Sequence, residues 1–145
     1  MKKEKATPRQ ENSLQNNPRH CSRGDNGGSS RPPLQRRQTK TERAYMLILS
    51  TPIGTTENDI LRVCRLSSGR NYTNLLEKAA QIQLKRISEP NPDGIGSHYR
   101  YQIRSAEDAY SAAMVISKLI VRRGAIPLTE DEVRRLTRPY EEEGA

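Results

Sequence analysis

The sequence predicts a mainly α domain that carries a small β-hairpin and follows a basic N-terminal arm. Residues 56–66 and 70–86 have the pattern of two helices joined by a Ser-Ser-Gly turn. Residues 98–104, HYRYQIR, alternate between two kinds of side chain as a strand with two different faces does. Residues 105–123 carry apolar side chains at helical spacing, which predicts a further long helix.

The charge of the chain is concentrated in its first 40 residues. Residues 1–40 hold 10 Lys and Arg against 3 Asp and Glu, a net charge of +7 out of +8 in total. They also contain few apolar side chains to offset the entropy lost on ordering, so we expect a disordered arm. Residues 41–145 hold 15 basic and 14 acidic side chains, so the folded part is nearly neutral.

A local excess of positive charge lies within the folded part. Residues 62–104 hold 8 basic and 3 acidic side chains, a local net charge of +5. Together with the basic arm, this excess favours a polyanionic partner, because each neutralised phosphate releases counterions. The alternative is that a basic arm only keeps a small protein soluble.

The first two helices are predicted from their end signals. Residues 42–50 form the first helix, which ends before Pro52 and Gly54. The second helix begins after Thr56, a good N-cap residue, with Asp59 three positions further on as in a capping box.

The third helix, residues 70–86, is the candidate binding element. Its apolar side is formed by Tyr72, Leu75, Leu76, Ala79, Ala80 and Ile82. Its outward residues include six candidate nucleic-acid ligands, Arg70, Asn71, Thr73, Asn74, Lys78 and Lys85. Arg and Asn pair with guanine and adenine edges, and Lys binds phosphates. Polar residues are also what any solvent-facing helix carries, so this pattern alone does not decide the function.

A polar loop and a strand follow the third helix. Residues 88–97 are rich in turn-forming residues, and residues 85–88 are a short partner for the strand at 98–104. His98 and Arg100 share the face opposite Tyr99 and Tyr101, where they meet solvent or phosphate. We interpret His98 as a surface residue and not as a catalytic base, because no carboxylate or nucleophile has a recognisable spacing to it.

Two helices complete the chain. Ser105 and Asp108 begin a helix that Gly124 ends, and Thr129 and Glu132 begin a last helix that reaches about residue 136. Residues 139–145 are then an acidic tail that starts at Pro139. The longer helix has an apolar stripe that either packs in the core or forms a homodimer interface, made of Ala109, Ala112, Ala113, Ile116, Leu119 and Ile120.

Residues 43–104 resemble the winged helix-turn-helix superfamily. The resemblance rests on residues 45–49, 56–66, 67–72, 75–76 and 99–103. It implies a winged domain at residues 41–104, a helical extension at 105–138, and double-stranded DNA as the partner, since many members regulate transcription as dimers. The family often has a Gly-apolar pair between the recognition helix and the wing. Residues 83–87 contain no glycine, so either the helix runs on or the wing is shaped differently.

The leading hypothesis is a non-enzymatic DNA-binding protein, and the alternative is a protein-interaction module that acts as an adaptor. RNA binding ranks third, since no RNA-recognition motif is present. An enzyme ranks last, and we expect no cofactor and no metal, because the chain has no phosphate-binding glycine loop or metal-ligand set. Cys21 and Cys64 are not expected to form a disulfide. Without an apolar leader or spanning segment, we expect an intracellular, cytoplasmic protein with no membrane partner.

Overall fold

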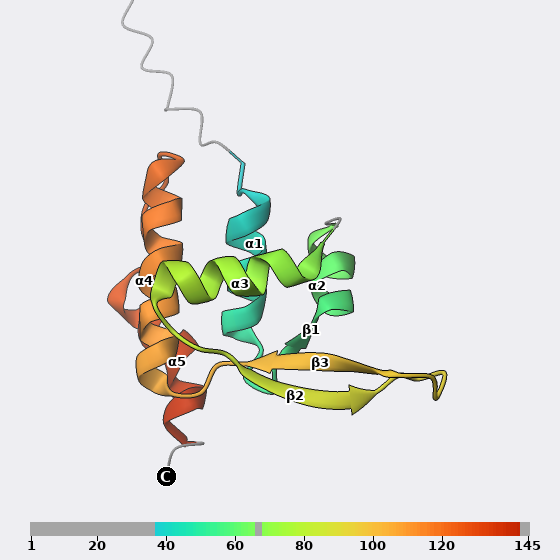
Figure 1. Ribbon diagram of the computed structural model, residues 1–145. Helices are drawn as coiled ribbons and strands as arrows, with labels where there is room; N and C mark the ends of the chain where they lie inside the picture. Colours follow the sequence, from blue (N-terminus) through green and yellow to red (C-terminus); the bar gives the residue numbers. More distant parts are fainter. Residues whose placement is uncertain (1–36, 66–67, 143–145) are drawn as a thin grey trace, which may run out of the picture. The chain divides into compact units, whose positions relative to one another are not determined.

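Helices and a small sheet alternate along the part of the chain that the computed structural model describes, residues 37–65 and 68–142. This part contains five helices and three strands, labelled in Figure 1. In order, they are α1 (Lys40–Ser50), β1 (Thr55–Thr56), α2 (Glu57–Cys64), α3 (Gly69–Ala80), β2 (Lys85–Pro90), β3 (Ser97–Gln102), α4 (Ala106–Arg122) and α5 (Glu130–Glu142). This order, with a small antiparallel sheet, is consistent with a winged-helix-like layout.

The described residues belong to one compact unit within Arg31–Ala145. The predicted disordered arm, residues 1–40, falls almost entirely outside the described part, and so does Leu66 in the predicted turn. The last residues of that arm are described, and α1 already begins at Lys40. The reason is a cap at Thr39, whose Oγ1 accepts a hydrogen bond of 3.1 Å from the Glu42 N–H.

The predicted hairpin is present, and the sequence pattern missed a third strand beside it. β2 and β3 pair from Lys85 opposite Gln102 to Pro90 opposite Ser97. β1 pairs with the other edge of β3, so the strand order is β1-β3-β2. Two residues are too few to show any alternation, which is why β1 could not be predicted.

Gly54 lets the chain approach β3 closely enough for β1 to pair. Its φ is +94°, and a Cβ at this position would lie only 2.8 Å from the backbone oxygen of Tyr101. A side chain would therefore collide with β3, and the backbone conformation itself favours glycine.

The N-terminus of α2 forms as predicted. Asp59 N–H donates to Thr56 Oγ1 at 3.2 Å, and Thr56 N–H donates to Asp59 Oδ2 at 2.9 Å, which closes the capping box. The hydrogen bond from the Thr56 backbone also lowers the pKa of Asp59 below its ordinary value.

The third helix is shorter than predicted. α3 ends at Ala80, because Gln81 adopts a left-handed conformation with φ of +55° and its N–H, like that of Ile82, donates to Glu77 O. These two bonds satisfy a carbonyl that the helix end would leave free. Gln81 thus takes the role that glycine has in the family pattern, and Lys85 and Arg86 belong to β2 instead of the helix.

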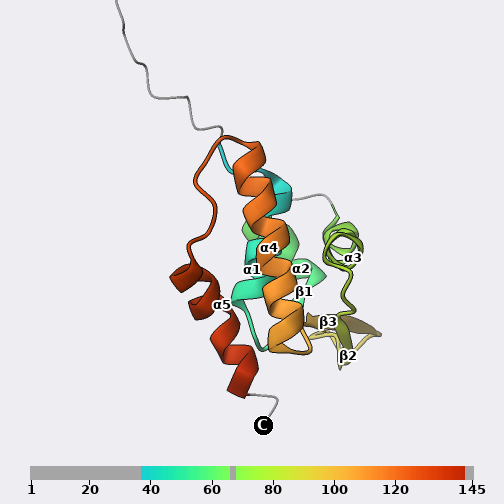
Figure 2. The ribbon, with the colours of Figure 1, turned by 90° about the vertical axis from the view of Figure 1, so that its left-hand side faces the viewer.

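The apolar stripe of α4 packs in the core, which is one of its two predicted roles. Five residues of its apolar stripe are fully or almost fully buried, namely Ala109, Ala112, Ala113, Ile116 and Ile120, while Leu119 is partly buried. α4 contacts α1, α3 and α5, and Figure 2 shows it between α3 and α5. The chain itself therefore covers most of this stripe.

An ion pair fastens the end of α4 to the start of α1. Arg123 Nε lies 2.9 Å from Glu42 Oε2, and Glu42 is 1% exposed. A carboxylate in this position needs its cation, because leaving either charge unpaired in the interior costs several kcal/mol, about 3–5 kcal/mol.

The predicted acidic tail is helical up to Glu142. α5 contains Pro139, and the next residue, Tyr140, is 3% exposed. The Tyr140 hydroxyl donates to Leu49 O at 2.7 Å, so a contact with α1 stabilises the last turn despite the proline. Thr129 and Glu132 form the predicted capping pair at the start of this helix. Only residues 143–145 of the predicted tail lie outside the described part.

Candidate nucleic-acid interface

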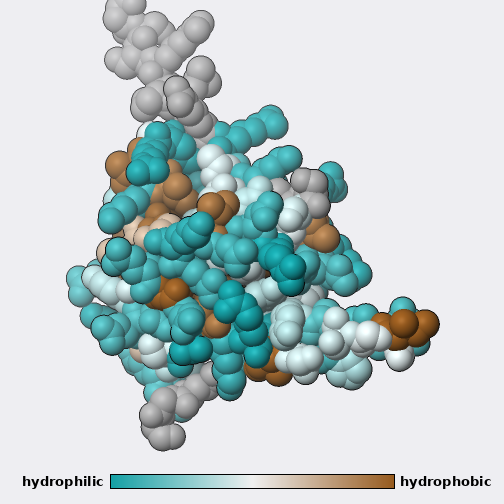
Figure 3. All heavy atoms as spheres, in the orientation of Figure 1, coloured by the Kyte–Doolittle hydropathy of each residue, from teal (hydrophilic) through white to brown (hydrophobic). Residues whose placement is uncertain are grey.

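Four of the predicted ligands lie together on the outside of α3. Arg70, Asn71, Asn74 and Lys78 are all exposed, and we call this set the α3 face. Figure 3 shows mostly hydrophilic atoms over α3 on this side of the molecule. α4 packs against α3 but leaves these four side chains exposed, and α5 lies on the far side of α4.

Arg70 is held loosely at the start of the α3 face. Its Nε lies 3.2 Å from Glu57 Oε1, and the two side chains are 62% and 41% exposed. A hydrogen bond with Tyr101 and the charge of Glu57 raise the pKa of Arg70, so the guanidinium stays charged. An ion pair this exposed contributes little to stability, and a phosphate or a base can replace its carboxylate.

Thr73 is not part of this face, contrary to the prediction. It is 0% exposed, and its Oγ1 donates to Arg70 O at 2.8 Å. The hydroxyl is satisfied by its own helix, which allows the side chain to be buried as if it were apolar. Thr73 therefore has no atom to offer to a ligand.

A hollow extends the α3 face toward the hairpin. It has a volume of about 440 Å³ and brings together Asn74, Lys78 and Arg86, with Glu77 between them. Glu77 accepts from Leu84 N–H and from Arg86 Nη2, both at 2.9 Å, and so fixes the connection from α3 to β2. Arg86 was not among the ligands predicted from the sequence, which placed it where the predicted helix and the short partner strand overlap.

Lys85 is exposed as predicted, but from β2. It lies at a second hollow with Gln102 and Arg104, at the base of the hairpin and away from its tip. Lys85 is therefore a neighbour of the α3 face and not a member of it.

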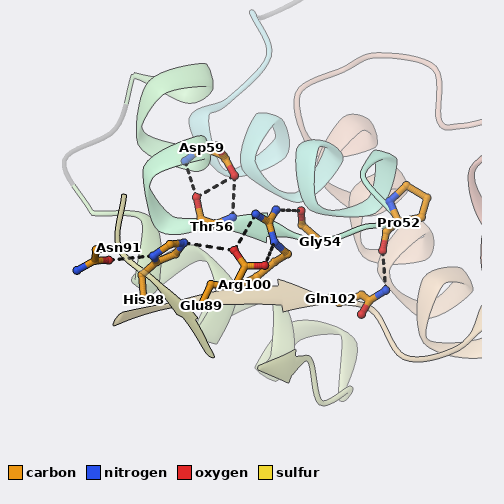
Figure 4. Close-up of polar contacts among 9 residues, drawn as sticks. All are labelled: Pro52, Gly54, Thr56, Asp59, Glu89, Asn91, His98, Arg100 and Gln102. Carbon is orange, nitrogen blue, oxygen red and sulfur yellow. Dashed lines mark hydrogen bonds and ion pairs between the residues drawn. The ribbon is translucent and has the colours of Figure 1, made fainter. Parts of the chain in front are cut away.

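Arg100 is engaged within the protein, contrary to the prediction. Its Nε and Nη2 donate to the two oxygens of Glu89 at 2.7 and 2.9 Å, and its Nη1 donates to Gly54 O at 3.0 Å. Figure 4 shows this guanidinium joining the hairpin to the segment before β1. The hydrogen bonds from Arg100 lower the pKa of Glu89 below its ordinary value. These three bonds use three of the five guanidinium N–H donors, so a ligand would compete with Glu89 and Gly54 for Arg100.

His98 is engaged in the same way. Its Nδ1 lies 2.9 Å from Asn91 Oδ1, and its Nε2 lies 3.5 Å from Glu89 Oε2. Figure 4 shows both ring nitrogens directed at these partners. We call Glu89, Asn91, His98 and Arg100 the hairpin network. Its two acceptors were not singled out from the sequence, because Glu89 and Asn91 stand among turn-forming residues that give no sign of a cross-strand partner.

Two further cations lie near the α3 face. Arg62 of α2 and Arg65, the residue that caps the C-terminus of α2, are exposed, and neither forms an ion pair within the part of the chain that the structure describes. Their position follows from the amphipathic pattern of α2, in which Ile60 and Cys64 face the core.

Residues 37–65 and 68–142 also bear on metal binding, membrane crossing and thiol chemistry. No group of His, Cys, Asp and Glu side chains is placed there to hold a metal ion. None of the described helices combines the length and the apolar character that crossing a bilayer requires. Cys64 is a buried free thiol, and burial raises its pKa, which keeps it protonated and unreactive.

Comparison with known proteins leaves the site to be interpreted from its own geometry. No family model matches the chain, and neither a curated protein nor a solved structure matches it.

Proposed function

We propose that this chain is a winged helix-turn-helix protein that binds double-stranded DNA and has no enzymatic activity. The observation that supports this most is the α3 face, four polar or basic side chains that are exposed on one helix and not covered by the rest of the chain. In such proteins the second helix of the pair enters the major groove. Here that helix is α3, with α2 before it and the β2–β3 hairpin after it.

The dimensions of α3 suit a major groove. Its 12 residues extend over about 18 Å, and a helix with its side chains is about as wide as the groove of B-DNA. Arg70, Asn71 and Asn74 supply donors and acceptors that pair with base edges, and Lys78 supplies a charge for a phosphate. Arg62, Arg65 and Lys85 flank this helix and would contact the backbone of the same duplex.

Binding to labelled duplexes tests the proposal. The intact protein is titrated at two salt concentrations against a random-sequence pool and against the sequences that the pool enriches. Affinity should fall steeply with salt, because several phosphates are neutralised. The Asn71→Ala/Asn74→Ala variant should lose the preference for enriched sequences, at about 1–3 kcal/mol for each paired base contact.

A control variant places two substitutions on α5, which Figure 2 shows on the far side of α4 from α3. Arg134→Ala/Arg138→Ala changes exposed residues of α5, whose side chains are 70% and 75% exposed. This variant should keep the affinity and the preference of the wild type. If the Asn71→Ala/Asn74→Ala variant also keeps both, α3 is not the reading helix and the proposal is wrong.

A second candidate function, a protein-interaction module, is favoured by the hairpin network. Two side chains that a DNA-binding wing would direct at phosphates, His98 and Arg100, are instead engaged with Glu89 and Asn91. The near-neutral charge of residues 41–145 points the same way. This candidate predicts binding to a protein that tolerates salt, with no shift of duplex DNA at any salt concentration.

A further inference from the structure

We propose that a groove between α1, α3 and α4 binds an acidic amphipathic helix of a partner protein. The groove has a volume of about 510 Å³ and is lined by side chains from all three helices. The groove shares Lys78 with the α3 face but contains neither Asn71 nor Asn74, and the proposal does not require that the protein bind DNA.

The floor of the groove is apolar and open to solvent. Leu75, Val115 and Leu119 line it, and Leu75 is 48% exposed. The sequence pattern placed Leu75 and Ala79 on the core side of α3, whereas both are exposed because α3 packs through Gly69, Thr73 and Leu76. Figure 3 shows apolar atoms gathered over the C-terminal half of α4, with hydrophilic atoms around them.

The rim of the groove is positively charged. Lys78, Lys118 and Arg122 surround the apolar floor, and no carboxylate lines it. In the described part of the chain these three cations form no ion pair. A ligand that satisfies both features must carry carboxylates beside apolar side chains.

The occupant that fits this chemistry is a helix with one apolar stripe and acidic flanks. Helix-in-groove recognition uses apolar side chains at positions i, i+3, i+4 and i+7, which an apolar floor between helices accommodates. The N-terminal arm of this chain is an unsuitable occupant, because its net charge of +7 would be repelled by the rim. A DNA backbone would leave the apolar floor uncovered.

The test measures the anisotropy of a fluorescein-labelled peptide with the intact protein. The peptide, of about 16 residues, has Leu at helical spacing and Glu on both flanks. Two control peptides carry the same residues in scrambled order, or Lys in place of Glu. The wild-type protein should bind only the acidic amphipathic peptide.

Two variants and a matched control locate the binding. Lys118→Glu/Arg122→Glu reverses two exposed charges on α4 and should weaken binding at least about tenfold. Leu75→Ser removes an exposed apolar side chain and should weaken it several-fold. Arg134→Glu/Arg138→Glu makes the same charge change on α5 and should leave the affinity unaltered. Circular dichroism and thermal unfolding verify that every variant is folded.

Several results would overturn this proposal. One is that the acidic peptide binds no better than the scrambled one, and another is that the groove variants bind it as the wild type does. If Lys118→Glu/Arg122→Glu instead weakens only duplex binding, the groove belongs to the DNA interface. If it abolishes self-association in sedimentation, the occupant is a second copy. The DNA proposal is tested separately, by the Asn71→Ala/Asn74→Ala variant. Its failure would therefore leave the peptide-binding results and their interpretation unchanged.

Discussion

α3 and the β2–β3 hairpin follow each other in the chain and carry similar polar side chains, but they use them in opposite ways. On α3, Asn71, Asn74 and Lys78 are exposed. On the hairpin, Arg100 and His98 are engaged with Glu89 and Asn91. Exposed groups can recognise a ligand, whereas engaged groups hold the protein together.

The difference arises from how each element places its neighbours. In the hairpin, Glu89 lies directly opposite His98 and diagonally across from Arg100, so partners of opposite charge are within reach. On α3, Glu57 pairs with Arg70 while both side chains stay largely exposed, and Glu77 is engaged with Leu84 and Arg86. The polar composition of a segment therefore does not say whether its side chains serve binding or stability; the available partners decide that.

The largest expected effect comes from breaking the attachment of the hairpin. Gly54→Ala places a Cβ 2.8 Å from Tyr101 O at a φ of +94°. We expect a loss of about 3 kcal/mol in the free energy of unfolding, from the collision and the strained backbone together. Urea unfolding followed by circular dichroism measures it. A variant as stable as the wild type would show that β1 does not need this close approach.

A smaller loss is expected when the hairpin network is broken. Arg100→Met keeps the apolar part of the side chain and removes its hydrogen bonds to Glu89 and Gly54. We expect a loss of about 1–2 kcal/mol in the free energy of unfolding, because the side chain is 26% exposed and water partly replaces its partners. Equal stability together with weaker DNA binding would instead mean that Arg100 serves as a phosphate ligand.

Thr73 provides a test within α3 itself. Thr73→Val removes a buried hydroxyl that donates to Arg70 O, while the shape of the side chain is kept. We expect a loss of about 1 kcal/mol in stability, measured by urea unfolding, and no change in sequence preference on DNA. A change in preference without a loss of stability would place Thr73 on the binding side after all.

The hairpin network also predicts a dependence on pH. The pKa of Glu89 is lowered mainly by its hydrogen bonds with Arg100, and the pKa of Asp59 and of Glu132 is lowered by backbone N–H donors. A carboxylate whose pKa is lower in the folded state stabilises the protein above its unfolded pKa, and this contribution is lost as the pH falls through the folded value. Burial raises the pKa of Asp108, which opposes the trend in part.

Unfolding is measured in urea at a series of pH values from neutral downward. The urea concentration at the midpoint of unfolding should decrease once the pH falls below the ordinary pKa range of carboxylates. The decrease should be smaller in Arg100→Met, because Glu89 then titrates nearer to its unfolded value. An identical pH profile in the two proteins would show that the Arg100–Glu89 pair contributes nothing to this dependence.

The smallest effect on stability is expected on the α3 face. Asn71→Ala/Asn74→Ala should change the free energy of unfolding by no more than about 0.5 kcal/mol, because both side chains are exposed and Ala favours helix. The same urea experiment measures it, alongside the loss of sequence preference described above. A destabilisation as large as that of Arg100→Met would erase the contrast between the two regions.

Several elements could be predicted because their signals are local. Thr56 with Asp59, Ser105 with Asp108, and Thr129 with Glu132 each form a cap within four consecutive residues, and each was found in the predicted place. The alternation over residues 98–104 correctly placed Tyr101 and Ile103 on the core side, whereas Tyr99, predicted on the same side, is 46% exposed. The exposure of Arg70, Asn71, Asn74 and Lys78 also followed from helical periodicity alone.

The errors share a different origin. α3 was predicted to reach residue 86, and its true end depends on bonds from Ile82, Leu84 and Arg86 to Glu77. No turn-forming residue marks Gln81, so nothing in the helical pattern announces the end. The burial of Thr73 depends likewise on the elements that pack against α3.

By itself, the sequence determined the three caps and the outward position of Arg70, Asn71, Asn74 and Lys78, because each depends on residues a few positions apart. Only the tertiary structure decided that Arg100 is engaged with Gly54, and that Tyr140 extends α5 by donating to Leu49. These contacts join residues 46 and 91 positions apart in the chain. Their formation depends on how the core brings distant segments together, which no local pattern of residues encodes.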